Sequence, residues 1–173
     1  MARGAAAIAH TEHWFSRLGL PFDETETRLA SGYLDALDLP VARMPAIAAD
    51  WRDAEAIVRD PQAGWGWWEQ EETERRLLMR ETEQRIGSQL LLESLTSAVD
   101  GHAESTYACA VKSCDGDEAR AKMASGAALT SIHLRALALL AGRGGRHLFV
   151  QKYALFAAGR FPLGTRRSTF TFF

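Results

Sequence analysis

Histidine and glutamate side chains are the residues of this chain that could perform acid–base or metal-assisted chemistry. Glu93 continues the apolar stripe of Leu90 at helical spacing, and His133 lies in a long apolar segment. His102 and Glu104 follow Glu93 along the chain. A buried glutamate facing a buried histidine shifts both pKa values, which creates an acid–base pair or part of a metal site. Glu93, His133, His102 and Glu104 are therefore the candidate catalytic residues.

The simpler alternative is structural. The chain has no Glu-x-x-His, the motif from which helical bundles build metal sites. We favour a Glu93 at the rim of the core and a His133 that is a core histidine bonded to a backbone carbonyl. No Gly-x-Ser-x-Gly motif occurs, and Cys109 and Cys114 are interpreted as small apolar fillers. The sequence thus indicates no cofactor and no confident metal site.

Three tryptophans within four residues form the second candidate, a binding segment of Trp65, Trp67 and Trp68. Clustered tryptophans at the start of a helix can anchor a partner or form one wall of a ligand pocket. We favour core packing for them, because each tryptophan buries a large apolar area.

Arginines of the basic C-terminal third form the third candidate, with Arg143, Arg146 and Arg160 as possible phosphate or acidic-surface ligands. The loop at 142–146 lacks the Lys-Ser/Thr pair and the glycine spacing of a P-loop. Nucleic acid is an unlikely partner, because the net charge is −2 and no standard motif is present. The alternative is internal neutralisation against the acidic stretch at 69–83, or a normal solvated face.

Charge is divided unevenly between the two parts of the chain. Residues 1–100 carry 10 basic and 18 acidic side chains, and residues 101–173 carry 10 basic and 4 acidic ones. This division suggests two faces, or two partners, of opposite sign.

Helical segments must position these candidates, and local signals mark their ends. The N-terminal third predicts helices over 4–18, from the Asp23 cap to Pro40, and over 45–58. A long helix is expected over 67–99, with a charged first half in solvent and an apolar second half buried.

The second half of the chain continues the helical pattern. Helices are predicted over 102–112, 118–140 and 147–158, the last ending at Gly159. The helix at 118–140 is apolar on most sides and is expected at the centre of a bundle. The alternating tail at 168–173 predicts a strand that pairs with 161–166 as a small hairpin.

These elements predict an all-α fold: a compact bundle of about six or seven helices with a short extended C-terminal arm or hairpin. A length of 173 residues fits a single helical domain over 1–173. No apolar run reaches the roughly 18 residues that cross a bilayer, and the N-terminus is a poor signal peptide. The cytoplasm is therefore the expected location.

Three classes of function fit this description. We favour a small cytoplasmic protein that binds a partner in a regulatory, neutralising or scaffold role, because charge and aromatic residues crowd its expected surface. The first alternative is a small enzyme with a pocket inside the bundle that uses Glu/His acid–base or metal-assisted chemistry. The second is a self-assembling structural subunit. The expected partner is a protein or a second copy of the chain; a small-molecule ligand is possible, and no membrane is expected.

Overall fold

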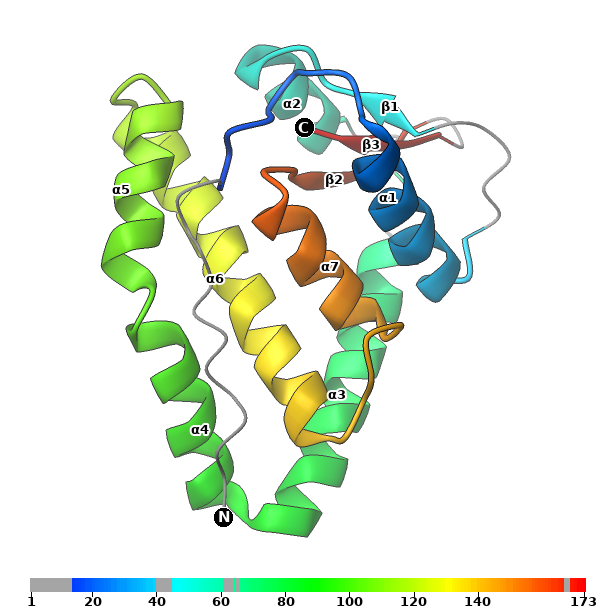
Figure 1. Ribbon diagram of the computed structural model, residues 1–173, viewed down its shortest axis with the longest axis vertical. Helices are drawn as coiled ribbons and strands as arrows, with labels where there is room; N and C mark the ends of the chain where they lie inside the picture. The colour runs from blue at the N-terminus through cyan, green and yellow to red at the C-terminus, as the bar shows by residue number, and fades with distance from the viewer. Residues whose placement is uncertain (1–13, 40–44, 61–63, 65, 167–168) are drawn as a thin grey trace.

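Seven helices and a three-stranded sheet make up the part of the chain that the structure describes (Figure 1). The structure, a computed structural model, describes residues 14–39, 45–60, 64, 66–166 and 169–173. The helices are α1 (Glu24–Ala36), α2 (Trp51–Val58), α3 (Gly66–Ile86), α4 (Ser88–Asp100), α5 (Ala103–Ser113), α6 (Glu118–Leu140) and α7 (Leu148–Ala157). The strands are β1 (Ala46–Ile47), β2 (Pro162–Arg166) and β3 (Thr169–Phe172). The predicted all-α fold with a short C-terminal hairpin is confirmed.

Helix α6 lies at the centre of the fold, as its sequence predicts. It packs against α5, α7, α4 and α3, and nine of its residues are buried. Asp117 caps its start, where the carboxylate accepts a hydrogen bond from the Arg120 amide. By length and composition α6 could cross a membrane. Its place between the other helices gives that apolar composition a different explanation, because a central helix is buried on several sides.

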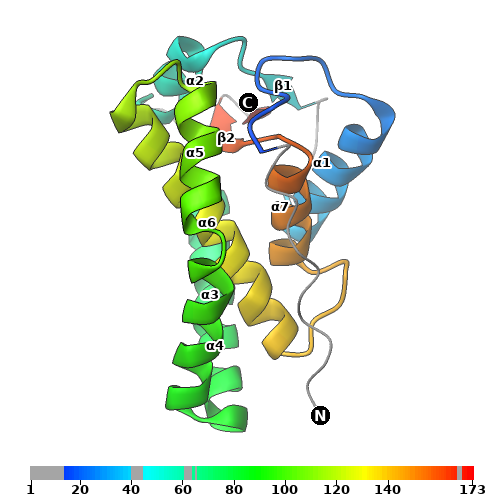
Figure 2. The ribbon, with the colours of Figure 1, turned by 60° about the vertical axis from the view of Figure 1, so that its left-hand side comes forward.

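A glycine divides the predicted helix over 67–99 into α3 and α4, so the prediction of one continuous helix is wrong. Gly87 has a φ of +83°, which glycine adopts without steric cost. From this point the two helices diverge as the arms of a V (Figure 1). The reversal places Leu91 and Leu95 of α4 in the same buried cluster as Leu134 and Leu137 of α6. Figure 2 shows α4 and α5 following one another along one side of α6.

Two N-terminal predictions also need correction. Within the described part of the predicted helix over 4–18, residues 14–18 form turns, and Phe15 has a φ of +60°. The rest of that segment lies outside the described residues. The predicted helix over 45–58 begins only at Trp51, after an Asp50 cap, because Ala46–Ile47 forms β1 instead. Helix α1 and its Asp23–Glu26 capping box are confirmed.

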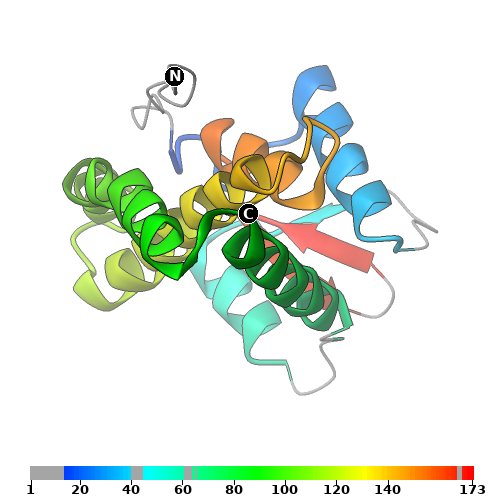
Figure 3. The same cartoon turned by 90° about the horizontal axis from the view of Figure 1, so that it is seen from below.

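The sheet has the order β1–β3–β2. The predicted hairpin is confirmed, since β2 and β3 pair antiparallel. The parallel pairing of β1 with β3 was not predicted, because β1 contributes only two residues from a distant part of the chain. Figure 3 shows the red strands from below, with α1 on one side and α2 on the other. Phe170, Phe172 and Phe173 are buried there and tie the sheet to the core.

Candidate functional site

No hydrogen bond or ion pair joins the four candidate catalytic residues, all of which the structure describes. Glu93 is exposed and accepts a hydrogen bond of 3.0 Å from Gln89 Nε2. Glu104 is also exposed, whereas His102 and His133 are half-buried. Within the described residues, no group of three or more His, Cys, Asp or Glu side chains is placed to hold a metal ion. The inward orientation of Glu93 was predicted from one apolar stripe that runs through Leu90. Glu93 faces outward because the helix that would carry this stripe is broken at Gly87.

His133 instead lines a groove in the open side of the V between α3 and α4. The groove has a volume of about 380 Å³. Its walls are formed by Met79, Glu83, Ser88, Leu91, Leu92, Leu95, Thr96, Val99 and Asp100. Burial and, to a smaller extent, the nearby Arg75 guanidinium lower the pKa of His133 below its ordinary value. His133 is therefore neutral at pH 7 and adds no charge to a largely apolar groove.

The outer side of α4 exposes apolar side chains, of which Leu92 lines this groove. Leu92 is 67% exposed and Leu90, its neighbour on α4, is 53% exposed. The expectation that the apolar half of the segment 67–99 is buried is thus wrong for these two leucines, because α4 has α6 against only one side. On α3, the 51% exposed Trp68 lies three turns before Met79 on the same stripe.

Basic residues adjoin the groove along α3. Arg75, Arg76 and Arg80 line a surface depression that shares Met79 with the groove. Glu72 pairs with both Arg75, at 2.7 Å, and Arg76, at 3.3 Å. Arg80 has no ion pair within the described residues. The three guanidinium groups thus have one carboxylate partner, which pairs with two of them, and this end of the groove is positively charged.

A second concave site, of about 610 Å³, lies between the end of α1, the start of α3 and the loop at 141–147. Its polar lining comes from Glu69, Gln70, Thr73, Glu74, Arg146 and His147. Here the structure places a predicted binding residue, Arg146, against the helix that begins at the tryptophan segment. It also forms a glutamate–histidine contact, Glu74 Oε1 to His147 Nε2 at 3.0 Å. Sequence reasoning missed this pair because 73 residues separate its members and no local motif links them.

Ion pairs connect α3 to α7 and to the loop before it. Arg143 contacts Glu81 at 2.7 Å, and Lys152 contacts Glu71 at 2.5 Å, in addition to the pair of Glu74 with His147. Internal neutralisation between the basic C-terminal third and the acidic stretch at 69–83 is therefore confirmed at these contacts. The predicted binding residue Arg143 is one of the residues that serve this purpose.

The pair of Glu71 and Lys152 belongs to a buried polar cluster. The Tyr33 hydroxyl donates a 2.7 Å hydrogen bond to Glu71 Oε1, and Lys152 Nζ lies 5.6 Å from the centre of the Trp67 ring. Burial, followed by the charge of Glu71, raises the pKa of Tyr33 well above its ordinary value. Trp67 packs against Phe170, as expected for core packing, whereas Trp65 lies outside the described residues.

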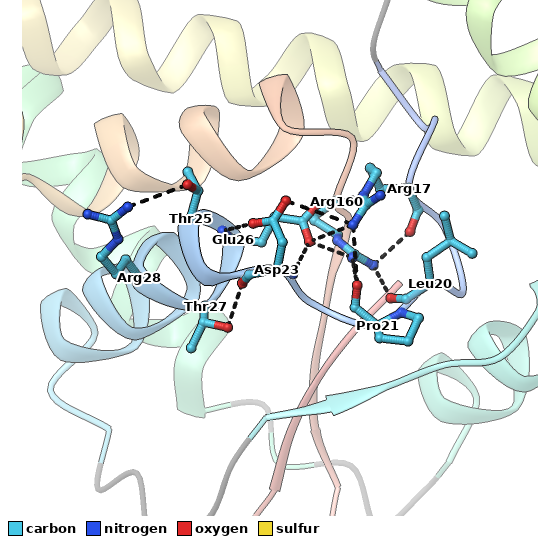
Figure 4. A network of polar contacts seen from close by, with 9 residues as sticks. All are labelled: Arg17, Leu20, Pro21, Asp23, Thr25, Glu26, Thr27, Arg28 and Arg160. Carbon is cyan, nitrogen blue, oxygen red and sulfur yellow. Dashed lines mark hydrogen bonds and ion pairs between the residues drawn. The ribbon is translucent and has the colours of Figure 1, made fainter.

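Arg160, the last predicted binding residue, is completely buried (Figure 4). Its guanidinium donates hydrogen bonds to three backbone carbonyls, those of Arg17, Leu20 and Pro21, and to the carboxylate of Glu26 at 2.7 Å. Burial alone would raise the pKa of Glu26, but hydrogen bonds from Arg160 and Arg17 outweigh it and lower the pKa to about 2. Arg160 therefore holds the N-terminal segment to the end of α7 and does not reach the surface.

Comparison with family models, curated proteins and solved structures finds no match to this chain. Two concave surfaces are left as candidates for function. One is the apolar groove between α3 and α4, and the other is the charged cleft beside Arg146.

Proposed function

We propose that this protein acts by binding a protein partner, whose amphipathic helix lies in the groove between α3 and α4. The observation that supports this proposal most directly is the exposure of Leu92 in the lining of an apolar groove. A regulatory or scaffold role in the cytoplasm fits such an interaction.

An exposed leucine in a groove, such as Leu92, favours binding because burying it releases water from apolar surface. Fully burying one leucine side chain contributes about 1.5–3 kcal/mol. An amphipathic helix in a groove presents anchors at positions i, i+3, i+4 and i+7, and leucines and Met79 offer matching contacts along α4 and α3. Trp68, further along α3, is of the residue type most enriched among the energetically dominant positions of interfaces.

Charge selects which helix fits. Arg76 and Arg80 extend from the α3 side at one end of the groove, while Glu83 and Asp100 line the groove itself. A partner helix with acidic side chains opposite the arginines complements this arrangement. Such a contact accelerates association and weakens as salt screens it.

Site-specific photo-crosslinking in the native host tests the proposal. A photo-reactive amino acid at position 92 is expected to capture one defined protein. The matched control is the same substitution at Met123, which is 51% exposed at the distant contact of α6 with α2. Capture must also be lost when Thr96→Glu is added, because the exposed Thr96 lines the groove one turn after Leu92.

Three other outcomes contradict the proposal. Equal crosslinked products from positions 92 and 123 indicate non-specific contact. The absence of any product at position 92 indicates that no protein partner lies in the groove. A crosslink to a second copy of the chain replaces the proposal with the self-assembling alternative.

A further inference from the structure

We infer that the cleft between α1, α3 and the loop at 141–147 binds a small zwitterion, a molecule with both an ammonium and a carboxylate group, such as an amino acid or a short peptide with free termini. The site is distinct from the groove of the proposed partner interaction. The cleft residues Glu69, Gln70, Thr73 and Glu74 occupy another face of α3 than Trp68 and Met79.

Opposite charges line the cleft without neutralising one another. Glu69 and Glu74 come from α3, and Arg146 comes from the loop. Arg146 is exposed, and within the described part of the chain it forms no ion pair with either glutamate. A ligand that carries both charges can pair its ammonium with the glutamates and its carboxylate with Arg146. A simple cation or a simple anion can pair with only one of the two sides.

The loop that carries Arg146 is fixed on both sides of that residue. Arg143 is held by Glu81, and His147 is held by Glu74. Gln151 Nε2 donates a 2.6 Å hydrogen bond to the Gly145 carbonyl. A guanidinium on an anchored loop loses less conformational entropy when it binds a carboxylate, to which it can donate two parallel hydrogen bonds.

Hydrogen bonding also orients Glu74. His147 Nδ1 accepts a hydrogen bond from the Phe149 amide, so the proton of the neutral ring is on Nε2, which faces Glu74 Oε1. Within the described residues the second oxygen, Oε2, accepts no hydrogen bond. That oxygen and the exposed carboxylate of Glu69 are the acceptors for a ligand ammonium.

Apart from Gln70, Thr73 and His147, the uncharged side chains of the lining are apolar, and they influence the character of the ligand. Ala36, Leu37 and Leu148 add apolar surface between the charged walls. A volume of about 610 Å³ lies within the ordinary range for small-molecule sites and is large enough for a short peptide. The cleft therefore favours a zwitterion with an apolar side chain.

Amide chemical-shift titration of the full chain tests this inference with glycyl-leucine as the probe. The amides of Gly66, Gly145 and Arg146 are expected to shift with saturation. The N-acetylated dipeptide lacks the ammonium and the dipeptide amide lacks the carboxylate, and each is expected to bind at least about tenfold more weakly. Free leucine distinguishes the two classes of ligand. Tighter binding of leucine indicates an amino-acid site, and tighter binding of the dipeptide indicates a peptide site.

Two substitutions complete the test. Arg146→Ala is expected to weaken dipeptide binding about tenfold or more. Arg52→Ala, which removes an exposed arginine of α2 outside the lining, is expected to leave the affinity unchanged. Equal binding of the capped dipeptides, an unaffected Arg146→Ala variant, or no saturable shift overturns the inference. None of these results bears on crosslinking at position 92, so the two proposals fail separately.

Discussion

Burial on α3 and on α4 is the opposite of what their compositions suggest. The charged helix α3 buries part of its charge against α7, and the apolar helix α4 exposes leucine on its outer side. Glu71 of the charged α3 is buried with Lys152 of α7, whereas Leu92 of the apolar α4 is 67% exposed. Composition therefore sets only the total of apolar and charged residues in each helix. The angle at which helices meet decides which of them are buried.

Arg160→Ala should produce the largest effect on the buried polar side of this comparison. The substitution removes four hydrogen bonds and leaves the buried carboxylate of Glu26 with only Arg17 as a charged partner. We expect a loss of about 3–5 kcal/mol in the free energy of unfolding. Urea denaturation followed by circular dichroism measures it. Adding Glu26→Gln should recover part of the loss, and a stability equal to the parent would contradict a structural role for Arg160.

Acid should weaken the same contact. The folded pKa of Glu26, about 2, is below its unfolded value of 4.5, so the carboxylate stabilises the fold above pH 4.5. This contribution is lost as the pH falls from 4.5 through 2, and it amounts to about 2–3 kcal/mol. Denaturation at a series of pH values should show a steeper decline for the parent than for Glu26→Gln. Identical slopes would disprove the shift.

The ion pairs between α3 and the α7 region should rank by burial. Glu71→Gln leaves Lys152 without its charged partner at a nearly buried position and should cost about 2 kcal/mol. Arg143→Ala breaks a pair whose two side chains are 38% and 43% exposed and should cost less than about 1 kcal/mol. Thermal or urea denaturation of the two variants gives the order. The reverse order would show that the buried cluster does not support this interface.

The exposed side of α4 should tolerate charge. Leu92→Glu replaces a largely exposed side chain, and the free energy of unfolding should change by less than about 0.5 kcal/mol. Urea denaturation checks this value. A loss above about 2 kcal/mol would show that Leu92 is packed in solution, and it would remove the apolar surface on which the partner proposal depends.

Much of the fold was predictable because its signals are local. The caps at Asp23 and Asp117 act on backbone amides within three residues, and they mark the starts of α1 and α6 correctly. Gly159, with a φ of +85°, follows the end of α7 as predicted. Alternation in the tail predicts β3 because a strand with one buried face repeats every two residues.

The candidate sites were less predictable because their residues meet only in three dimensions. Arg146 is placed in a cleft, but its neighbours Glu74 and His147 carry no motif. Arg160 resembles a surface arginine in the sequence, and only its contacts with a segment about 140 residues away show that it is buried. Burial depends on which surfaces pack together, and the composition of one segment does not contain that information.

Local signals along the chain specify the starts of α1 and α6, the central place of α6 and the C-terminal hairpin, since each depends on backbone hydrogen bonds or on periodicity within one segment. Tertiary structure alone decided the reversal at Gly87, the pairing of β1 with β3 and the side chains that form the two concave surfaces. Those features depend on free energies that arise when distant segments exclude water together.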